Sequence, residues 1–240
     1  MNKITDRLDA ILTDEFTKVI ESNRLAKALS PDFADLRLYA LYLIQTYHYT
    51  RHNPRHQALV VASDRDLLPG YARYCLRHAQ EEWGHEMMAH HDLQKIGFKF
   101  DLDLWPKPLS ETEALIAYLY KISQSGSPYA RLGYTFWAER CYGFINMSLK
   151  SMASKLGLDS TAMTFLVAHS SIDEKHALEV EEVVSQFVRT PEDEAAVTEV
   201  MLTSLRLTVT MMDAVFDRFS ELKEHGQDQD QILNEFYANV

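Results

Sequence analysis

The sequence consists of a succession of helical patterns with almost no strand signal, and this feature constrains the fold most strongly. Alternation with period two between turn residues is missing, whereas apolar residues recur at helical spacing. Helices are expected at residues 5–23, 30–52, 54–62, 69–97, 110–123, 128–156, 160–188 and 190–223. Without a linker or repeat, the long helices near 70–96, 128–156 and 160–188 must pack together, which predicts an all-α bundle.

Short local signals set several of the expected helix ends. Ser110 and Glu113 match a capping box, and "TPED" at Thr190 opens the last helix. Gly157 follows the end of the helix at 128–156, as glycine often does. The second helix is expected to start at Ser30 and Pro31.

Length and composition indicate one soluble domain. The chain has 240 residues, of which 46% are hydrophobic, so a single domain over 1–240 with a helical body at about 5–223 is expected. No apolar run approaches the roughly 18 to 20 residues of a membrane span, and no secretory signal is recognisable. The only cysteines, Cys75 and Cys141, suit a reducing compartment, which predicts a cytoplasmic protein. The net charge of -11 argues against nucleic-acid binding.

Three polar residues interrupt the apolar face of the helix expected at 160–188. His169, Asp173 and His176 are spaced four and three residues apart and share an arc of about 60°. Burying them without partners is costly, so they need hydrogen bonds or a metal. Two imidazoles and a carboxylate suit iron(II), zinc or manganese. A hydrogen-bonded core network explains this triplet almost equally well.

A second candidate pair lies in "RHAQEEWGHEMMAHH". Glu82 and His85 form an ExxH pair, the spacing that helical bundles use for carboxylate-bridged metals. The spacing does not decide the assignment, because Glu81 lies four residues before His85, and His78, Glu82 and His85 also form a set at offsets of zero, four and seven. A solvated charged face is an equally good interpretation of this pair.

Glu139 is a lone carboxylate in an apolar helical stripe. An ion pair with Arg140, or with a basic residue of another helix, is the simple alternative, but Arg140 projects about 100° away from Glu139 on a helix. With Glu139, three expected helices supply three carboxylates and three imidazoles, namely Glu82, His85, Glu139, His169, Asp173 and His176. Six ligands are enough for two metal ions that share a bridging carboxylate.

This ordered set resembles the haem-oxygenase-like di-iron oxidases and oxygenases, relatives of the TENA/THI-4 and PqqC-like proteins. The resemblance rests on ExxH in "EEWGH", the glutamate of "WAERC" and "HSSIDEKH", and it covers roughly residues 10 to 222. It implies a haem-oxygenase-like bundle of seven to eight helices. It also implies two ferrous ions held by the six residues, with the second often loosely bound, so that a purified sample can be metal-poor.

The same resemblance implies an oxygen-dependent reaction on a small organic substrate. Members of the group carry out N-oxygenation, C–C cleavage or desaturation of amino acids and fatty acids. The implied partners are the substrate and O2, and a homodimer is expected. Four residues near the expected ligand helices are candidates for binding a substrate carboxylate: Arg73, Arg77, Arg131 and Tyr134.

Other functions of the same fold stay open. A TENA-type thiamine-pyrimidine hydrolase needs a cysteine nucleophile, for which Cys141 is the candidate, although an offset of two points it away from Glu139 on a continuous helix. A haem oxygenase needs an axial histidine near the start of the chain, and the first histidine is His48. His48, His52 and His56 form a ladder that Pro54 interrupts. A metal-free regulatory module is the non-enzymatic alternative.

Overall fold

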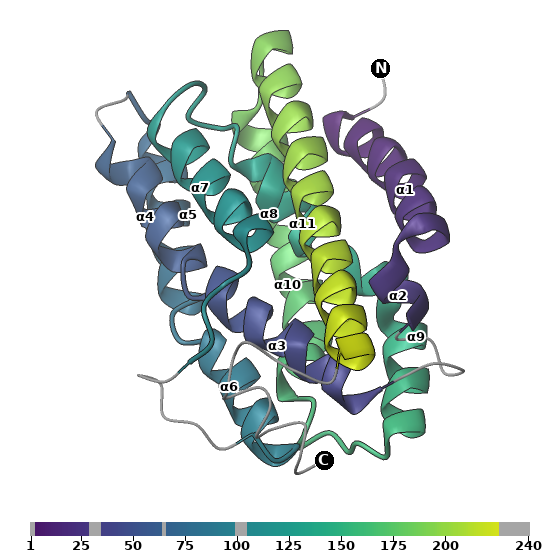
Figure 1. Cartoon of the computed structure of the whole chain (residues 1–240). Coiled ribbons are helices and arrows are strands. Elements are labelled where there is room, and N and C mark those ends of the chain that lie inside the picture. The colour runs from purple at the N-terminus through teal and green to yellow at the C-terminus, as the bar shows by residue number, and fades with distance from the viewer. Residues whose placement is uncertain (1–2, 29–34, 64–65, 99–104, 226–240) are drawn as a thin grey trace.

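A computed structural model describes residues 3–28, 35–63, 66–98 and 105–225 of the chain (Figure 1). The side chains at 142, 146, 148, 167–174 and 224–225 lie outside the described part. The expected helix start at Ser30 and Pro31, and the C-terminal tail, also fall outside it.

Every regular element within the described ranges is a helix, which confirms the all-α prediction. The helices are α1 (Ile4–Ser22), α2 (Arg24–Ala28), α3 (Leu36–Thr50), α4 (Asn53–Ala62), α5 (Pro69–Glu81), α6 (Glu86–Lys95), α7 (Ser110–Gln124), α8 (Leu132–Ala138), α9 (Cys141–Leu156), α10 (Thr164–Phe187) and α11 (Pro191–His225). The Thr190 hydroxyl accepts the Asp193 amide and so caps α11 as expected. Leu109, and not Ser110, precedes the first residue of α7, so the expected capping box is absent there.

Two of the expected long helices are interrupted, and both interruptions lie at candidate ligands. The helix expected at 69–97 is divided into α5 and α6 by a turn over 82–85, where Gly84 adopts a φ of 96°. The helix expected at 128–156 starts only at Leu132 and is divided between α8 and α9. There the Arg140 amide bonds the Trp137 carbonyl three residues back, which tightens the helical turn. These breaks change the direction in which the side chains after them project from the helix.

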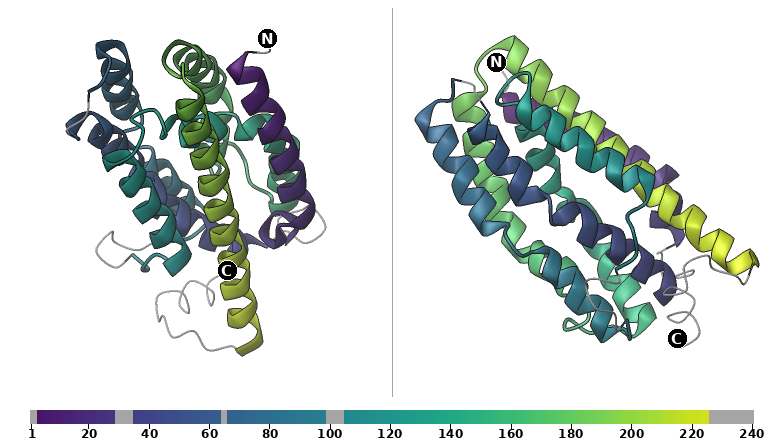
Figure 2. Two further views of the ribbon diagram at one scale, coloured as in Figure 1. Left: turned by 90° about the horizontal axis from the view of Figure 1, so that it is seen from above. Right: turned by 60° about the vertical axis from the view of Figure 1, so that its left-hand side comes forward.

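Helix α11 runs the length of the bundle and packs along α7 and α8, with further contacts to α1, α2 and α3 (Figures 1 and 2). The approach of α8 is very close, because a Cβ atom at Gly133 would lie 2.1 Å from the Val197 carbonyl oxygen. Helix α10 packs against α5, α6, α8 and α9. Three helices that carry candidate ligands, α5, α8 and α10, are thereby brought together.

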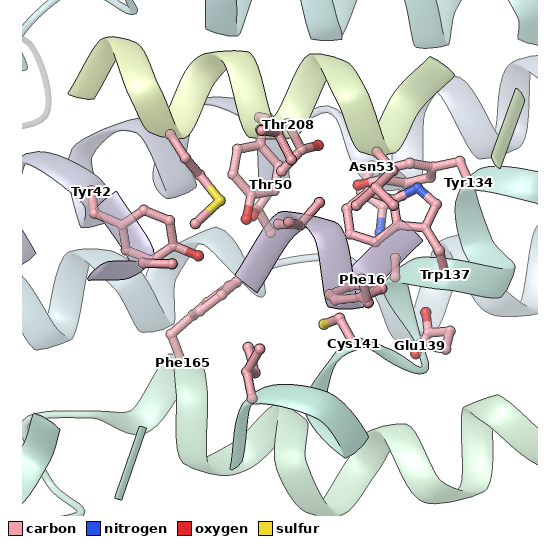
Figure 3. Close-up of a pocket in the computed structure, with 18 of the residues that line it drawn as sticks. Phe16, Tyr42, Thr50, Asn53, Tyr134, Trp137, Glu139, Cys141, Phe165 and Thr208 are labelled. Atoms are coloured by element: carbon pink, nitrogen blue, oxygen red, sulfur yellow. The ribbon is translucent and has the colours of Figure 1, made fainter. Parts of the chain in front are cut away.

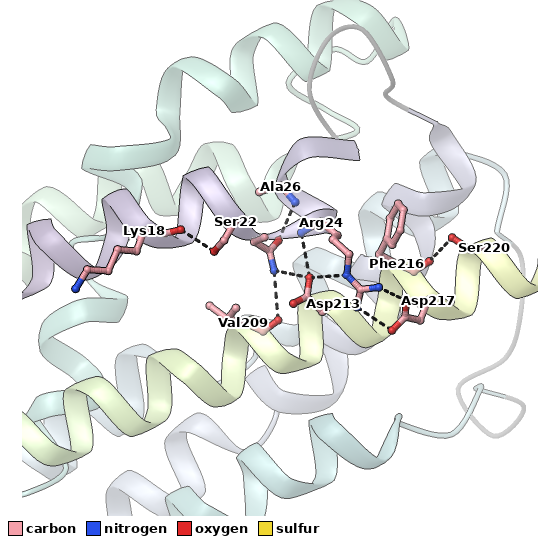
Figure 4. A network of polar contacts seen from close by, with 10 residues as sticks. Lys18, Ser22, Arg24, Ala26, Val209, Asp213, Phe216, Asp217 and Ser220 are labelled. Atoms are coloured by element: carbon pink, nitrogen blue, oxygen red, sulfur yellow. Dashed lines mark hydrogen bonds and ion pairs between the residues drawn. The ribbon is translucent and has the colours of Figure 1, made fainter.

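Two carboxylates connect helices that lie far apart in the sequence. Buried Asp92 of α6 accepts the amides of Thr164 and Phe165 and therefore caps α10. On the opposite side, Asp213 of α11 accepts the Arg24 amide at 3.0 Å, which holds the corner between α1 and α2 (Figure 4). Both contacts tie elements that lie far apart in the sequence.

Helix α11 is the one described helix that is long and apolar enough to cross a membrane, with a mean hydropathy of 1.2 over its best window. Length and composition alone make this weak support, because the core helix of a globular protein meets the same criterion. In this bundle, α11 packs against five other helices.

The buried apolar residues form two clusters. One contains side chains of α1, α4, α5, α7 and α8, the other contains side chains of α2, α3, α6 and α9, and α10 and α11 contribute to both. Tyr49, Cys141 and Ile145 pack against both clusters. They mark the junction between the two halves of the core.

Candidate metal centre

The candidate centre is built by three helices at the two helix breaks. His78 lies in the last turn of α5, and Glu82 follows four residues later as its C-cap, so the two share a face. Glu139 is the C-cap residue of α8, and His176 lies in α10. All four side chains are buried, and each offers a ligand atom within 4.8 Å of the others.

Glu139 occupies the middle of this cluster. Its Oε1 lies 3.3 Å from Nε2 of His78, and its Oε2 lies 3.3 Å from Nδ1 of His176. The neighbouring Arg140 does not pair with Glu139, because its guanidinium contacts Asp9 at 2.9 Å instead. The ion pair between adjacent residues is therefore excluded as the reason for a buried Glu139.

Two further acidic contacts surround His176. Oε2 of Glu81 lies 3.5 Å from its Nε2, and Oε1 of Glu82 lies 3.8 Å from its Nδ1. His85 lies beside the cluster, with Nδ1 3.4 Å from Oε2 of Glu82. Glu82 and Glu139 are thus buried beside the partly exposed Glu81, and buried negative charge is costly unless cations balance it.

The electrostatics of the metal-free cluster show how strongly its members depend on one another. Burial raises the pKa of Glu139, but the contacts with His176 and His78 outweigh it and lower the pKa to about 2. Burial likewise raises the pKa of Glu82, and the contact with His85 reverses the shift, so that its pKa is lowered. The pKa of His176 is raised, chiefly by Glu139. Without a metal, the raised pKa of His176 favours its protonated form, whose positive charge faces Glu139.

The donor set fits a metal such as iron. Both ring nitrogens of His78 and Nδ1 of His176 are buried. Within the described part of the chain, these three atoms have no well-formed hydrogen bond. Buried imidazole nitrogens that face carboxylates without satisfying them are arranged as metal ligands are. Imidazole and carboxylate donors together suit iron(II).

A hydrogen-bonded chain behind the cluster orients Glu82. Asn53 donates from Nδ2 to Oε2 of Glu82 at 2.7 Å, and its Oδ1 accepts from Nη2 of Arg131 at 2.6 Å. Arg131 is 2% exposed and also donates to Nδ1 of His56 at 3.0 Å and to the Thr135 hydroxyl at 2.7 Å. Asn53 thus connects a buried cation to a carboxylate of the cluster, as partners of metal ligands commonly do.

The structure brings together Glu82, Glu139 and His176 of the six expected ligands, with His85 adjacent. It adds His78, whose offset of four from Glu82 is present in the sequence but is one of three competing spacings. The other two expected ligands, His169 and Asp173, lie on the described backbone of α10, but their side chains are outside the described residues.

The residues suggested for substrate binding lie in different places. Tyr134 lines a cavity next to the cluster, and Arg131 is buried one layer behind it. Arg73 is exposed on α5, and Arg77 forms an ion pair with Glu179. Neither of these two arginines is among the residues that line the cavity.

The cavity has a volume of about 180 Å³ and opens onto Glu82 and Glu139. Figure 3 shows Glu139 and Trp137 at one end and Tyr42 with Phe165 at the other. Six aromatic side chains line it: Phe16, Tyr42, Tyr49, Tyr134, Trp137 and Phe165. Cys141 also lines it, together with Glu139. The expectation that Cys141 points away from Glu139 assumed a continuous helix, and the break between α8 and α9 removes that assumption.

Comparison with known proteins identifies the family of the chain. A family model described as "Iron-containing redox enzyme" matches residues 40–209, a range that includes all six expected ligands and His78. The chain belongs to this family. No curated protein matches the chain.

Comparison with solved structures shows that the chain has the haem-oxygenase-like fold, which confirms the predicted fold. A domain of unknown function with a heme oxygenase-like fold from Shewanella denitrificans is 41% identical, with a TM-score of 0.87 over 93% of this chain and 96% of that one. A TenA homologue from Pseudomonas syringae pv. tomato is 15% identical, with a TM-score of 0.72 over 88% and 92%. One from Pyrococcus furiosus is also 15% identical, with a TM-score of 0.64 over 87% and 99%. The TenA likenesses concern the fold alone.

Proposed function

We propose that the chain is a non-haem di-iron oxidase or oxygenase that uses O2 to oxidise a small organic substrate. The observation that carries the proposal is the buried cluster of His78, Glu82, Glu139 and His176 in a member of an iron-containing redox family. In the proposal, bound ferrous ions supply the electrons that activate O2. The protein residues hold the ions and shape the space beside them.

Two irons, and not one, are proposed because of the position of Glu139. Its two oxygens face different imidazoles, at 3.3 Å each, so Glu139 would hold one ion together with His78 and a second together with His176. His85 supplies a further imidazole beside Glu82. Helical periodicity places positions 169 and 173 on the same face of α10 as His176, so the proposal retains His169 and Asp173 as ligands.

The surrounding residues have defined tasks in this proposal. Asn53 holds one oxygen of Glu82 and leaves the other free for an ion. The aromatic lining of the cavity excludes water and holds the substrate against Glu139. The proposal also includes a homodimer in the cytoplasm. Size-exclusion chromatography with light scattering tests the oligomeric state.

One observation favours a second candidate, a TenA-type hydrolase. Cys141 lines the same cavity as two carboxylates, as a nucleophile beside acid groups would. The two functions differ in their requirement for iron and for the thiol. Cys141→Ser abolishes a hydrolase but leaves oxygen chemistry largely intact.

The experiment is an oxygen-uptake assay on the chain loaded anaerobically with ferrous iron. The expected result is O2 consumption that is abolished by Glu139→Ala and retained by Cys141→Ser. If instead the metal-free chain releases pyrimidine product, and Cys141→Ser stops the release, the hydrolase is correct. Absence of both activities together with absence of iron uptake favours the metal-free module.

A further inference from the structure

The part of the cavity that lies away from the carboxylates determines which molecule can enter. In Figure 3, this part extends from Thr50 and Thr208 towards Tyr42 and Phe165. Helix α3 supplies Tyr42 and Thr50, and α11 supplies Thr208. It forms the distal arm of the cavity, defined here by Tyr42, Thr50, Phe165 and Thr208.

No cationic side chain is among the described residues that line the distal arm. Glu82 and Glu139 are the only charged residues among the described residues that line the cavity, and they lie at the other end. A carboxylate or phosphate seated in the distal arm would lose its water without gaining a cation. The arm therefore selects against ligands that carry a negative charge there.

One polar group in the arm lacks a partner. Thr50 is 4% exposed, and its hydroxyl has no hydrogen-bond partner in the described part of the protein. The nearby Thr208 hydroxyl, in contrast, donates to the Ser204 carbonyl at 3.0 Å. A buried hydroxyl without a partner costs free energy unless a ligand or a water satisfies it. Thr50 thus provides one neutral hydrogen-bonding position halfway along the cavity.

The size and lining of the cavity suit an aromatic ring. Its volume of about 180 Å³ slightly exceeds the roughly 150 Å³ of an apolar cavity that binds benzene. Aromatic side chains, among them Tyr42, Tyr49 and Phe165, offer edge and face contacts to a ring.

We infer that the cavity takes an uncharged aromatic molecule of about the size of a substituted benzene, with a hydroxyl or carbonyl group that bonds Thr50. The inference rests on the proposed function in one respect, namely that this cavity is the substrate site. It does not require a metal to be bound. It excludes substrates, such as free amino acids, that would place a charged carboxylate in the distal arm.

Three probes of similar size test the inference on the full chain after metal removal with a chelator. They are p-cresol, p-xylene and 4-methylbenzoate, with binding measured by ligand-observed NMR. We expect p-cresol to bind roughly three- to tenfold more tightly than p-xylene, as one neutral hydrogen bond provides. We expect 4-methylbenzoate to bind at least about tenfold more weakly than p-cresol, because its charge finds no cation.

Two threonine variants locate the hydrogen bond. Thr50→Val keeps the shape of the side chain and is expected to abolish the preference for p-cresol over p-xylene. Thr5→Val is the matched control, because Thr5 of α1 is also buried, with no hydrogen-bond partner for its hydroxyl in the described part of the protein, but does not line the cavity; it should retain the preference. Thermal unfolding verifies that both variants fold.

The inference is overturned if p-cresol does not bind, if 4-methylbenzoate binds equally well, or if Thr50→Val leaves the preference unchanged. These results are independent of iron, because the probes are bound by the metal-free chain. A failure of the proposed function would instead appear as absent iron uptake or absent oxygen uptake, while probe binding persists.

Discussion

Replacing Asn53 by alanine separates the orientation of a metal ligand from the stability of the fold. Asn53 gives Glu82 a hydrogen bond of 2.7 Å and accepts one of 2.6 Å from Arg131. Asn53→Ala removes both at once. A hydrogen bond to a charged group contributes about 1.5–3 kcal/mol, and loss of such a partner of a ligand weakens metal binding roughly 10- to 100-fold.

Thr135→Val is the matched control for Asn53→Ala. It removes another hydrogen bond from Arg131, of 2.7 Å, but does not touch Glu82. Both variants should therefore lower the free energy of unfolding of the metal-free chain, because buried Arg131 loses a partner in each. Only Asn53→Ala should also weaken metal binding.

The assay is an anaerobic titration with Co²⁺ or Fe²⁺, followed by absorbance, next to urea unfolding of the metal-free proteins. The reasoning is refuted if Asn53→Ala binds metal as tightly as the wild type. It is also refuted if Thr135→Val weakens metal binding by as much, since the effect would then come from Arg131 or from general loosening.

Three further predictions concern stability. Gly84→Ala forces a side chain into a φ of 96° and should cost on the order of 1–3 kcal/mol in urea unfolding, whereas Gly143→Ala in α9 should be neutral or stabilising. Burial and, as the second cause, the charge of Arg131 lower the pKa of His56. The contribution of His56 to the free energy of unfolding is therefore complete above pH 6.5 and is lost as the pH falls. Relative to His56→Gln, the wild type should then lose up to about 1.4 kcal/mol per pH unit below pH 6.5, and parallel pH curves would contradict this. Asp92→Ala leaves the first amides of α10 unpaired and should cost about 1.5–3 kcal/mol, while an unchanged urea midpoint would argue against the cap.

The fold was accessible from the sequence because its signals are local. Helical periodicity and cap residues such as Thr190 and Gly157 predict the helices, and Gly157 does end α9, with a φ of 66°. The breaks at Gly84 and Glu139 were not predicted. Gly84 is a poor helix former and so offered a local signal at the first break, whereas helix-forming residues continue across Glu139, where packing between α8 and α10 decides the geometry.

The candidate site was partly accessible for a related reason. Glu139 and His176 interrupt apolar faces, Glu82 belongs to an ExxH pair, and the structure brings the three together. His78 was not selected, because spacing alone cannot rank it against Glu81. The side chains that line the cavity depend on which helices pack around it and how their breaks rotate them. No pattern within a single helix carries that information.

The most direct test of the central claim is the iron content of the chain after anaerobic loading and removal of free metal. The account predicts two ferrous ions per chain in the wild type. It also predicts loss of at least one ion in Glu139→Ala, since the side chain of Glu139 lies between His78 and His176. A wild-type chain that retains no iron, or a Glu139→Ala variant that retains as much as the wild type, would contradict it.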